Sequence, residues 1–356
     1  MSHSIEQLIA IDLGNGTTSY IAGAGEIRGS FASLVAPAQS NQGLGGGFTR
    51  ESFKTKFGSF YIGDDCREDG AAPRSTDSSY YSSDSIKVLF LKVLKEVGQK
   101  NPIIVTGLPT EFFKLRRNEF ASDLKKWAIE EGYQPASINV LPQYVGPWFD
   151  PELLDPEGQV IDPRVVMEGK LGIIDIGQGT TDAGQFVDGK VSSDDKLRWG
   201  ESSGVSDIHK KLFTQLKQVD ALNAILPAKS RLPKDFSLDT QTTEYTMDTW
   251  LRKGFIPWRG SRIDIDPISL PARQEFADDV VSRCINTVWG KTDFMAGMVL
   301  AGGGAIVLGR KLLQTYINTV IYMAKDPENS IVRGYHRFYV TQNFKEQARM
   351  KVAQRG

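Results

Sequence analysis

The sequence predicts an α/β protein made of two related lobes that face each other across a shared cleft. Its 356 residues are enough for two domains, each with its own hydrophobic core. Residues 9–18 and 173–182 carry the same motif, D-[LI]-G-[NQ]-G-T-T, with five of its seven positions identical. Between the two copies, apolar runs typical of buried strands flank a helical pattern. A motif repeated at the spacing of a domain indicates a duplicated lobe.

The composition excludes several kinds of site. The chain has 42 Lys and Arg against 43 Asp and Glu, a formal net charge of −1, so we expect no direct binding of nucleic acid. Its two cysteines support neither a disulfide framework nor a thiolate metal cluster. The three histidines, His3, His209 and His336, are not at metal-ligand spacing. A zinc hydrolase is therefore not expected.

The ends and hydropathy of the chain predict a cytoplasmic location. Residues 1–7 are polar and lack the basic flank of a signal peptide. No stretch has the roughly 20 apolar residues that are needed to span a bilayer. We therefore expect no membrane partner.

Each copy of the motif is predicted to form a β-hairpin. Each follows an apolar run and precedes a second short apolar run, at residues 19–22 and 183–187. This is the pattern of a strand, a tight glycine turn and a returning strand. One copy alone would be an ordinary turn, for which Asp and Gly are favoured in any case. Two copies in one chain favour a functional role.

The residue types of the two turns predict a site for a magnesium-bound nucleoside triphosphate. The glycines are expected to allow positive φ angles and to expose backbone N–H groups that bind phosphate oxygens, with threonine hydroxyls adding donors. Asp12 and Asp175 would repel a bare phosphate, but they become favourable once Mg²⁺ lies between. The predicted hydrogen-bond donors are Gly14, Gly16, Thr17 and Thr18 in the first turn and Gly177, Gly179, Thr180 and Thr181 in the second.

Further elements follow in chain order. Residues 38–85 are rich in Gly, Ser, Asp and Tyr and are interpreted as an insertion, in which Tyr80 and Tyr81 are expected to be ordinary exposed aromatics without an assigned role. A buried strand over 103–108 precedes an amphipathic helix over 111–131. The apolar positions of that helix are Phe112, Leu115, Phe120, Leu124, Trp127 and Ala128. A strand over 138–142 ends at Gln143, which the local pattern alone describes as an ordinary loop residue.

A third glycine-rich turn completes the predicted site. Residues 226–271 are interpreted as a surface subdomain, and residues 294–300 as a strand. Gly302, Gly303 and Gly304 then precede a helical pattern over 306–323. Three adjacent glycines exceed what a plain turn needs and let a flat ring or ribose approach the backbone. We interpret this turn as a nucleoside-binding element.

With these motifs in hand, the chain resembles the superfamily of actins, heat-shock chaperones and sugar kinases. The two hairpins resemble its two phosphate motifs, and residues 300–305 resemble its adenosine motif. Within it, the chain is most similar to bacterial ParM-type actins, which segregate plasmids. The segments that carry this closer similarity are T-G-L-P at 106–109, G-E-S-S-G-V-S-D-I at 200–208, D-P-E-N-S at 326–330 and R-G-Y at 333–335.

The resemblance implies roles for individual residues. Asp12 would hold Mg²⁺ through water, and Asp175 would face the metal and the γ-phosphate. Residues 14–17, which include Asn15, and residues 177–180, which include Gln178, would bind phosphate oxygens. Gln143 falls where the superfamily carries a Gln or Glu that positions the attacking water, and an amide would orient the water rather than deprotonate it. One position departs from the family, because Ser19 stands where many actins have a phosphate-contacting lysine.

The resemblance also implies an actin-like fold and its division. Residues 1–170 would form domain I, with the insertion near 38–85, and a C-terminal helix over 335–356 would complete it. Residues 171–334 would form domain II, with a surface subdomain near 210–271.

The implied function is that of an ATPase which polymerises into dynamic filaments for plasmid segregation. The cofactors would be ATP and Mg²⁺, with GTP left open. The partners would be further copies of the chain and an adaptor protein bound to centromere-like plasmid DNA. Two alternatives remain open: a small-molecule kinase of the same fold, acting on a sugar or carboxylate, and a bacterial cytoskeletal filament with no role in plasmids.

Overall fold

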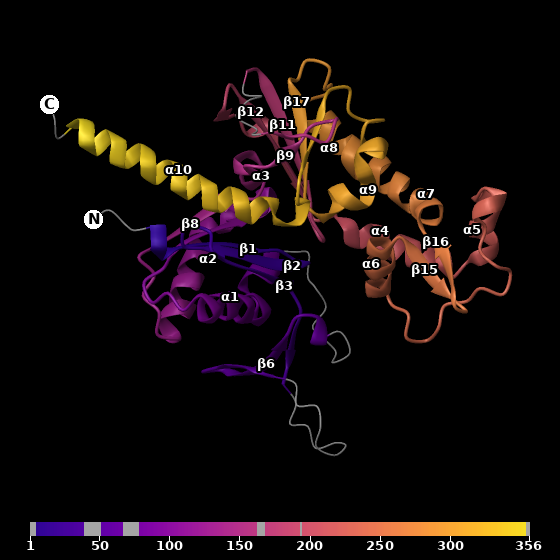
Figure 1. Ribbon diagram of the computed structural model, residues 1–356, viewed down its shortest axis with the longest axis horizontal. Helices are drawn as coiled ribbons and strands as arrows, with labels where there is room; N and C mark the ends of the chain where they lie inside the picture. Colours follow the sequence, from indigo (N-terminus) through magenta and orange to yellow (C-terminus); the bar gives the residue numbers. More distant parts are fainter. Residues whose placement is uncertain (1–4, 39–50, 67–77, 162–167, 193, 354–356) are drawn as a thin grey trace.

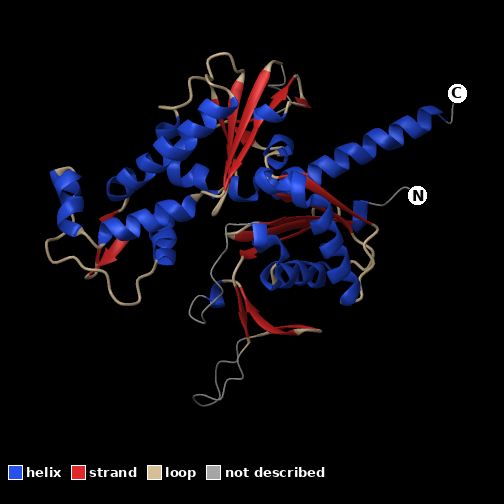
Figure 2. Cartoon of the chain, turned by 180° about the vertical axis from the view of Figure 1, so that it is seen from behind, coloured by secondary structure: helices blue, strands red, loops and turns tan. Residues whose placement is uncertain are grey.

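The structure is a computed structural model that describes residues 5–38, 51–66, 78–161, 168–192 and 194–353. Two lobes, each built on a β-sheet, lie on either side of a central region, and a long C-terminal helix extends away from both (Figure 1). The view from behind shows the same helix projecting beyond the body of the protein (Figure 2). The α/β fold class expected from the sequence is confirmed.

The first lobe is built on a five-stranded sheet in the order β3-β2-β1-β7-β8. Its strands are β1 (Leu8–Leu13), β2 (Thr17–Ala22), β3 (Ile27–Ala32), β7 (Ile103–Leu108) and β8 (Ser137–Pro142). The pairs β1/β2 and β2/β3 are antiparallel, whereas β1/β7 and β7/β8 are parallel. The first repeat is therefore a β-hairpin, as predicted.

The second lobe repeats this arrangement inside a larger sheet of eight strands. Here β14-β12-β11-β17-β18 has the same order and the same mixture of antiparallel and parallel pairs. The strands are β11 (Lys170–Ile176), β12 (Thr181–Val187), β14 (Arg198–Glu201), β17 (Gly297–Ala301) and β18 (Ile321–Ala324), with β9 (Leu153–Leu154), β10 (Val160–Ile161) and β13 (Lys190–Val191) at the edges. Two sheets with one topology show that the sequence repeat reflects duplicated lobes.

Helices cover both faces of each sheet, which explains why β1, β7 and β17 are buried along their whole length. In the first lobe these are α1 (Asp84–Val97), α2 (Thr110–Glu130) and α10 (Ser330–Ala353). In the second they are α3 (Val145–Phe149), α4 (Val205–Leu216), α7 (Asp266–Phe276), a π-helical turn (Ala277–Val281), α8 (Ser282–Val288) and α9 (Gly303–Leu313).

Two smaller units extend from the lobes. The first is a three-stranded sheet of β4 (Val35–Pro37), β5 (Phe53–Thr55) and β6 (Gly58–Ile62). The second consists of α5 (Val219–Ile225), α6 (Glu244–Lys253) and the hairpin of β15 (Phe255–Trp258) and β16 (Ser261–Asp264). They overlap the two segments that composition marked as an insertion and a surface subdomain, but β4 lies before residue 38 and α5 before residue 226. Residues 39–50 and 67–77 of the first segment lie outside the described residues.

The helices that follow the two sheets each pack on the sheet of the other lobe. Helix α3 follows β8 of the first sheet, yet Tyr144, Val145 and Trp148 pack with residues of the second sheet. Helix α10 follows β18 of the second sheet, yet Val332 and Tyr335 pack on the first. The expectation that a C-terminal helix lies with the first lobe agrees with this packing, but the helix begins at Ser330 rather than at 335.

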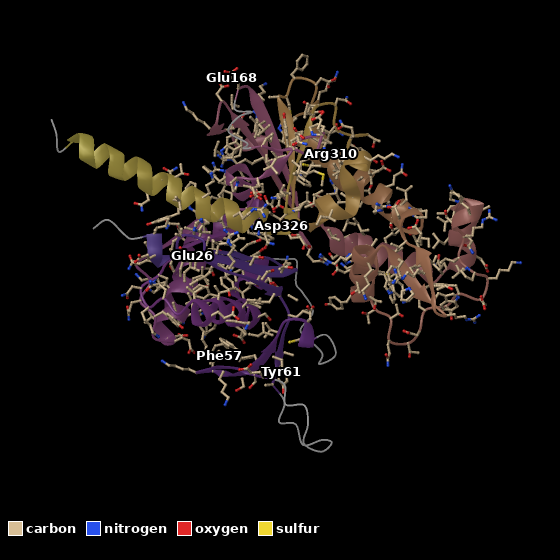
Figure 3. The ribbon with its side chains drawn as sticks, in the orientation of Figure 1. Glu26, Phe57, Tyr61, Glu168, Arg310 and Asp326 are labelled. Atoms are coloured by element: carbon tan, nitrogen blue, oxygen red, sulfur yellow. The ribbon has the colours of Figure 1, made fainter. Side chains whose placement is uncertain are left out.

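The two helices cross at a pair of glycines. A Cβ on Gly334 would collide with the carbonyl group of Gly146, so the backbones are in direct contact. Beside this crossing, Arg333 Nε donates to Asp150 Oδ1 at 2.9 Å and Nη2 donates to Oδ2 at 2.5 Å. Asp326, which Figure 3 labels between the lobes, also pairs with Arg333 Nη1 at 3.3 Å. The lobes are therefore joined by a buried, charge-paired crossing.

The expected domain boundary at residue 170 is too late. Strand β9 pairs with β18, so the second sheet already contains residues from position 153 onward. The cause is local, since the short strands β9 and β10 carry no periodic pattern long enough to be recognised.

The expected helix over 306–323 is also wrong in its second half. Helix α9 ends at Leu313, and β18 begins at Ile321. The intervening and following residues include several β-branched side chains, which favour a strand over a helix. Periodicity alone does not separate the two structures over so short a run.

Two further expectations about single side chains fail. Leu115 is 87% exposed, because the buried stripe of α2 passes through Arg116 instead, whose guanidinium donates to the Ser78 carbonyl oxygen. Tyr80 and Tyr81 are buried rather than exposed on the surface. The Tyr81 ring packs edge-on against Phe120 with their centroids 5.8 Å apart, so it belongs to the core of the first lobe.

Candidate functional site

A cavity of about 600 Å³ lies where the two glycine hairpins and the third glycine turn meet. It is lined by both lobes and by one face of α6. Of the residues predicted for the site, all but Gly304 line this cavity: Asp12, Gly14, Asn15, Gly16, Thr17, Gln143, Asp175, Gly177, Gln178, Gly179, Thr180, Gly302 and Gly303. Segments that are far apart in the sequence therefore converge on one concave surface.

The first turn, residues 14–16, is held by hydroxyl groups of its own lobe. Ser33 Oγ donates to the Gly14 carbonyl at 2.6 Å, and the Ser33 amide donates to the Gly16 carbonyl at 3.0 Å. The Tyr80 hydroxyl donates to the same Gly14 carbonyl at 3.3 Å. Because these bonds occupy carbonyl oxygens, the turn is fixed without using its N–H groups.

The second turn, residues 177–180, is held by the first turn of α4. The amides of Val205 and Ser206 donate to the carbonyls of Gly177 and Gln178 at 3.0 and 2.9 Å. Gly204 is required just before this helix, because a Cβ there would lie 2.6 Å from the Gly177 carbonyl oxygen. The free N–H groups at the N-terminus of α4 are thus used to fix the turn rather than a ligand.

Gly14, Gly16 and Gly177 of the two hairpins are needed because other groups lie close to their Cα atoms, and not because of an unusual backbone conformation. The predicted positive φ angles are absent at Gly14, Gly16, Gly177 and Gly179. Instead, a Cβ on Gly16 would lie 2.8 Å from the Cβ of Gln178, so the turns of the two lobes touch each other there. A positive φ of 77° occurs in the third turn, at Gly302, where a Cβ would also collide with the Ile176 carbonyl and the Asp175 carboxylate.

The third turn follows β17 and begins α9, as predicted. Gly303 lines the cavity, and a Cβ there would lie 3.2 Å from Glu328 Oε1. Gly304 instead faces Ile176 of the second sheet, where an added Cβ would clash. The expected role of Gly304 at the ligand is therefore replaced by a packing role between α9 and β11.

Three buried carboxylates lie close together at the two hairpins, two of them in the lining of the cavity, and no ion pair with any of them occurs among the described residues. Burial raises the pKa of Asp12 to about 7, although the Gln143 amide opposes this shift. Burial also raises the pKa of Asp175 well above its ordinary value, and the charges of Asp182 and Asp12 add to the effect. The pKa of Asp182 is raised by burial to about 6, against hydrogen bonds from Thr110. Such a site favours a bound cation.

The donor set fits a magnesium ion that keeps most of its water. Asp175 Oδ1 and Asn15 Oδ1 are buried and have no hydrogen-bond partner in the described part of the chain. The described residues contain no group of three or more His, Cys, Asp or Glu side chains that could hold a metal alone. Mg²⁺ is commonly bound by one or two carboxylates together with water and substrate phosphates. Asp12 and Asp175, which both line the cavity, would be those carboxylates.

Gln143 lies beside the first of these carboxylates. It directly follows β8, its amide nitrogen donates to the Leu108 carbonyl at 2.9 Å, and its side-chain Nε2 donates to Asp12 Oδ1 at 3.4 Å. The side chain is 6% exposed and lines the cavity. The structure therefore places a neutral hydrogen-bonding group in the wall of the cavity, beside Asp12.

Several residues of the cavity were not identified from the sequence. Tyr81 lines it from the first lobe, and Asp248, Thr249, Arg252 and Lys253 line it from α6. On α6, Arg252 Nε donates to Asp248 Oδ1 at 3.0 Å and Nη2 donates to Glu328 Oε1 at 2.6 Å. The i, i+4 spacing of Asp248 and Arg252 was a usable signal, but residues 226–271 contain no motif that ties them to the glycine turns.

Asp182 was visible only as the last residue of the second repeat. In the hairpins, Asp12 is the cross-strand partner of Ser19, and Asp175 is that of Asp182. The Asp182 carboxylate accepts a hydrogen bond from the Thr110 amide at the start of α2, in the other lobe. The helix lacks a side-chain cap from its own N-cap residue, Pro109, so this contact caps α2 across the cleft.

At position 19 itself, where many actins have a lysine, this chain supplies no positively charged side chain. Ser19 is buried, and its hydroxyl donates to Ser30 Oγ at 3.4 Å. Among the described residues, the positively charged side chains that line the cavity are Arg252 and Lys253, both on α6.

Comparison with protein families identifies both halves of the chain. The profile of the N-terminal domain of actin-like proteins matches residues 10–141. The profile of the C-terminal domain of the MreB-like archaeal actin homologue matches residues 173–314. Together these matches cover well over half of the chain and include both hairpins. The chain is an actin-like protein.

Solved structures show the same fold for this actin-like protein over nearly its whole length. A non-polymerisable quadruple mutant of the pCBH ParM protein has a TM-score of 0.68 and 19% identity, covering 94% of this chain and 99% of that one. A subunit of a 15-stranded ParM filament from Clostridium botulinum has a TM-score of 0.64 and 19% identity, with coverages of 93% and 98%. An archaeal actin homologue, Ta0583, in complex with ADP has a TM-score of 0.62 and 17% identity, with coverages of 94% and 99%.

Two further observations concern the curated relatives of the sequence and the helices of the structure. No curated protein matches the sequence of this actin-like protein. Within the ranges that the structure describes, none of the helices combines the length and the apolar character needed to cross a membrane.

Proposed function

We propose that this actin-like protein binds and hydrolyses a magnesium-bound nucleoside triphosphate and assembles into filaments with further copies of itself. The observation that carries the proposal is the convergence of the two repeated turns on one cavity, with Asp12 and Asp175 buried and uncompensated between them. The ADP complex of the archaeal homologue and the ParM filament support the two halves of the proposal, since they share the fold.

The residues divide the work of the reaction. The turns at 14–17 and 177–180 bind phosphate oxygens through backbone N–H groups and threonine hydroxyls, and Gly302 and Gly303 let the nucleoside approach the backbone. Asp12 and Asp175 hold Mg²⁺, which neutralises charge on the phosphates when it is bound. Gln143 orients the attacking water through its side-chain amide, and it does not accept the proton because an amide is a very weak base.

We further propose that the filaments serve plasmid segregation through an adaptor protein. The similarity to solved ParM structures supports the role in plasmid segregation. The net charge of −1 argues against direct binding of DNA, so an adaptor is needed. Purified filaments should therefore not retard bare DNA at physiological salt in a gel-shift assay. Retardation without an adaptor would contradict this part alone.

The decisive experiment is sedimentation and light scattering with Mg-ATP, Mg-GTP, Mg-ADP or no nucleotide. The wild-type chain is expected to form a pelletable polymer with a triphosphate, whereas Asp175→Ala should remain in the supernatant. If no nucleotide produces a polymer while a sugar or carboxylate becomes phosphorylated, the small-molecule kinase replaces the filament protein.

The role of Gln143 has its own test. Gln143→Ala should still polymerise with Mg-ATP but should release phosphate about 100-fold more slowly, because misplacing an attacking group costs roughly that factor. Release of phosphate at the wild-type rate would remove Gln143 from the mechanism.

A further inference from the structure

His209 connects the phosphate end of the cavity to helix α6. It lies on α4, one turn beyond the amides that hold the second glycine turn, and is only 3% exposed. Its Nδ1 lies 3.4 Å from Gln178 Nε2, and its Nε2 lies 3.9 Å from Asp248 Oδ1. A single buried imidazole thus faces a residue of the phosphate turn on one side and a residue of α6 on the other.

The chemistry of the two neighbours selects one tautomer of the ring. An amide nitrogen is a donor, so Nδ1 accepts from Gln178. The proton of the neutral ring is then on Nε2, where it faces the carboxylate of Asp248. Both neighbours favour the same arrangement, in which the amide donates to the ring and the ring presents N–H to the carboxylate.

Beyond Asp248 the contacts continue to the nucleoside end of the cavity. Asp248 accepts from Arg252 at 3.0 Å, and Arg252 donates to Glu328 at 2.6 Å. Glu328 Oε1 lies against Gly303, in the third glycine turn. Gln178, Asp248, Arg252, Glu328 and Gly303 all line the cavity, whereas His209 does not. The imidazole is therefore the buried connection in a series of polar contacts that spans the cavity.

We propose that His209 is a positioning residue that couples the two ends of the nucleotide site. It fixes the Gln178 side chain, which lies against Gly16 of the other lobe, and it aligns Asp248 so that Arg252 and Glu328 keep their places beside the third turn. The contact of 3.9 Å between Nε2 and Asp248 is longer than a hydrogen bond, so the ring N–H and the carboxylate interact there electrostatically. This inference rests on the proposed function, because it takes the ligand to be a nucleotide.

Two substitutions at position 209 separate the contact with Gln178 from the contact with Asp248. Asparagine at 209 places its Oδ1 near the position of Nδ1, so His209→Asn keeps an acceptor for Gln178 and loses the contact with Asp248. Glutamine reaches the position of Nε2, so His209→Gln keeps a donor toward Asp248 and loses the acceptor for Gln178. Lys211→Gln, on the exposed face of α4 and away from the cavity lining, is the matched control.

The two variants at position 209 are expected to change different kinetic constants. His209→Gln should lower kcat about fivefold with KM nearly unchanged, because the phosphate turn loses one hydrogen bond. His209→Asn should raise KM, and the Kd for ADP, about fivefold with kcat nearly unchanged. Asp248→Asn should resemble His209→Asn, and the double variant His209→Asn with Asp248→Asn should be no weaker than either single one. The Lys211→Gln control should match the wild type.

A second measurement needs no nucleotide. The chain has three histidines, so ¹⁵N-labelled histidine gives few resonances, and their long-range ¹⁵N–¹H couplings report the tautomer. We expect the Nε2–H form for His209, identified by the resonance that disappears in His209→Asn. An Nδ1–H tautomer would overturn the arrangement of donors on which the proposal rests.

The outcomes separate the two proposals. If isothermal titration of the wild type detects no binding of Mg-ATP or Mg-ADP, the proposed nucleotide function fails, whichever tautomer is found. If nucleotide binds but both His209 variants stay within twofold of the wild type, or if the effects of His209→Asn and Asp248→Asn add in full, the coupling is overturned while the nucleotide function stands. A loss of both kcat and affinity in both variants would assign His209 to packing alone.

Discussion

The two glycine turns have nearly the same sequence but are supported in different ways. Hydroxyl groups hold the first turn from its own lobe, through Ser33 and Tyr80. The N-terminus of a helix holds the second, through the amides of Val205 and Ser206. In both cases the supporting groups donate hydrogen bonds to carbonyl oxygens of the turn, and these bonds do not use the N–H groups of the turn. The two repeats therefore share the face that lines the cavity, while the scaffold behind it differs.

The carboxylates beside the turns diverge in the same manner. Asp12 has Gln143 as a hydrogen-bond donor, whereas Asp175 Oδ1 has no hydrogen-bond partner among the described residues. The position across the hairpin is Ser19 in the first lobe and Asp182 in the second, and Asp182 also reaches over to α2 of the first lobe. The negative charge is thus concentrated on the second lobe, and the two aspartates are not equivalent.

The largest expected effect separates the two aspartates. Asp175→Asn should lower the rate of nucleotide hydrolysis by about 100-fold or more, since it removes a charge that faces the metal. The same variant should raise the melting temperature of the nucleotide-free protein by a few degrees, because it removes an uncompensated buried charge. Parallel measurements on Asp12→Asn supply the comparison, with a smaller gain in melting temperature. Equal gains in the two variants would show that the lobes are electrostatically alike.

A smaller effect tests the contact between the turns. In Gly16→Ala the new methyl group meets Gln178 at 2.8 Å, so the turns must separate, and we expect nucleotide affinity to fall about tenfold. In Gly177→Ala the nearest atom is the Thr180 carbonyl oxygen at 3.3 Å, so the loss should be no more than about threefold. Titration calorimetry with ADP measures both. The reverse order would place the critical approach in the second turn rather than between the two.

The smallest effect concerns pH. Asp12 and Asp182 have pKa values of about 7 and about 6 in the folded protein, above the ordinary value of 3.8. The folded state therefore binds more protons than the unfolded state between about pH 4 and pH 7, and stability falls as the pH rises through this range. Thermal melts of the nucleotide-free protein should show this decline, and Asp12→Asn should show a shallower one. A melting temperature that rises from pH 5 to pH 7 in the wild type would be inconsistent with these shifts.

The sequence predicted the part of the site that local chemistry determines. Strand, glycine turn and returning strand are specified within about ten residues, so both hairpins were placed correctly together with Asp12 and Asp175. Gln143 was placed at the end of β8 because a short apolar run in the sequence defines its own end. These are features that need no knowledge of the rest of the chain.

Features that depend on packing between distant segments were not predictable. Asp248 and Arg252 reach the cavity only because the subdomain that carries α6 folds over it, and their spacing is common on exposed helices. The burial of Tyr81 depends on rings contributed by α2. The hairpin glycines were expected to need positive φ angles, whereas Gly14, Gly16 and Gly177 need space instead, against the opposite lobe or a neighbouring carbonyl.

The exchange of α3 and α10 between the lobes has a consequence for how the chain attains its structure. Each sheet receives a covering helix that is encoded beside the other sheet, so neither half can complete its hydrophobic core from its own segment of sequence. During synthesis the first sheet can be covered only after helix α10 has been made, and Gly146 can pack against Gly334 only then. The molecule is therefore a single cooperative folding unit in spite of its duplicated architecture, and a nascent chain released before residue 330 would expose an apolar sheet face to its neighbours.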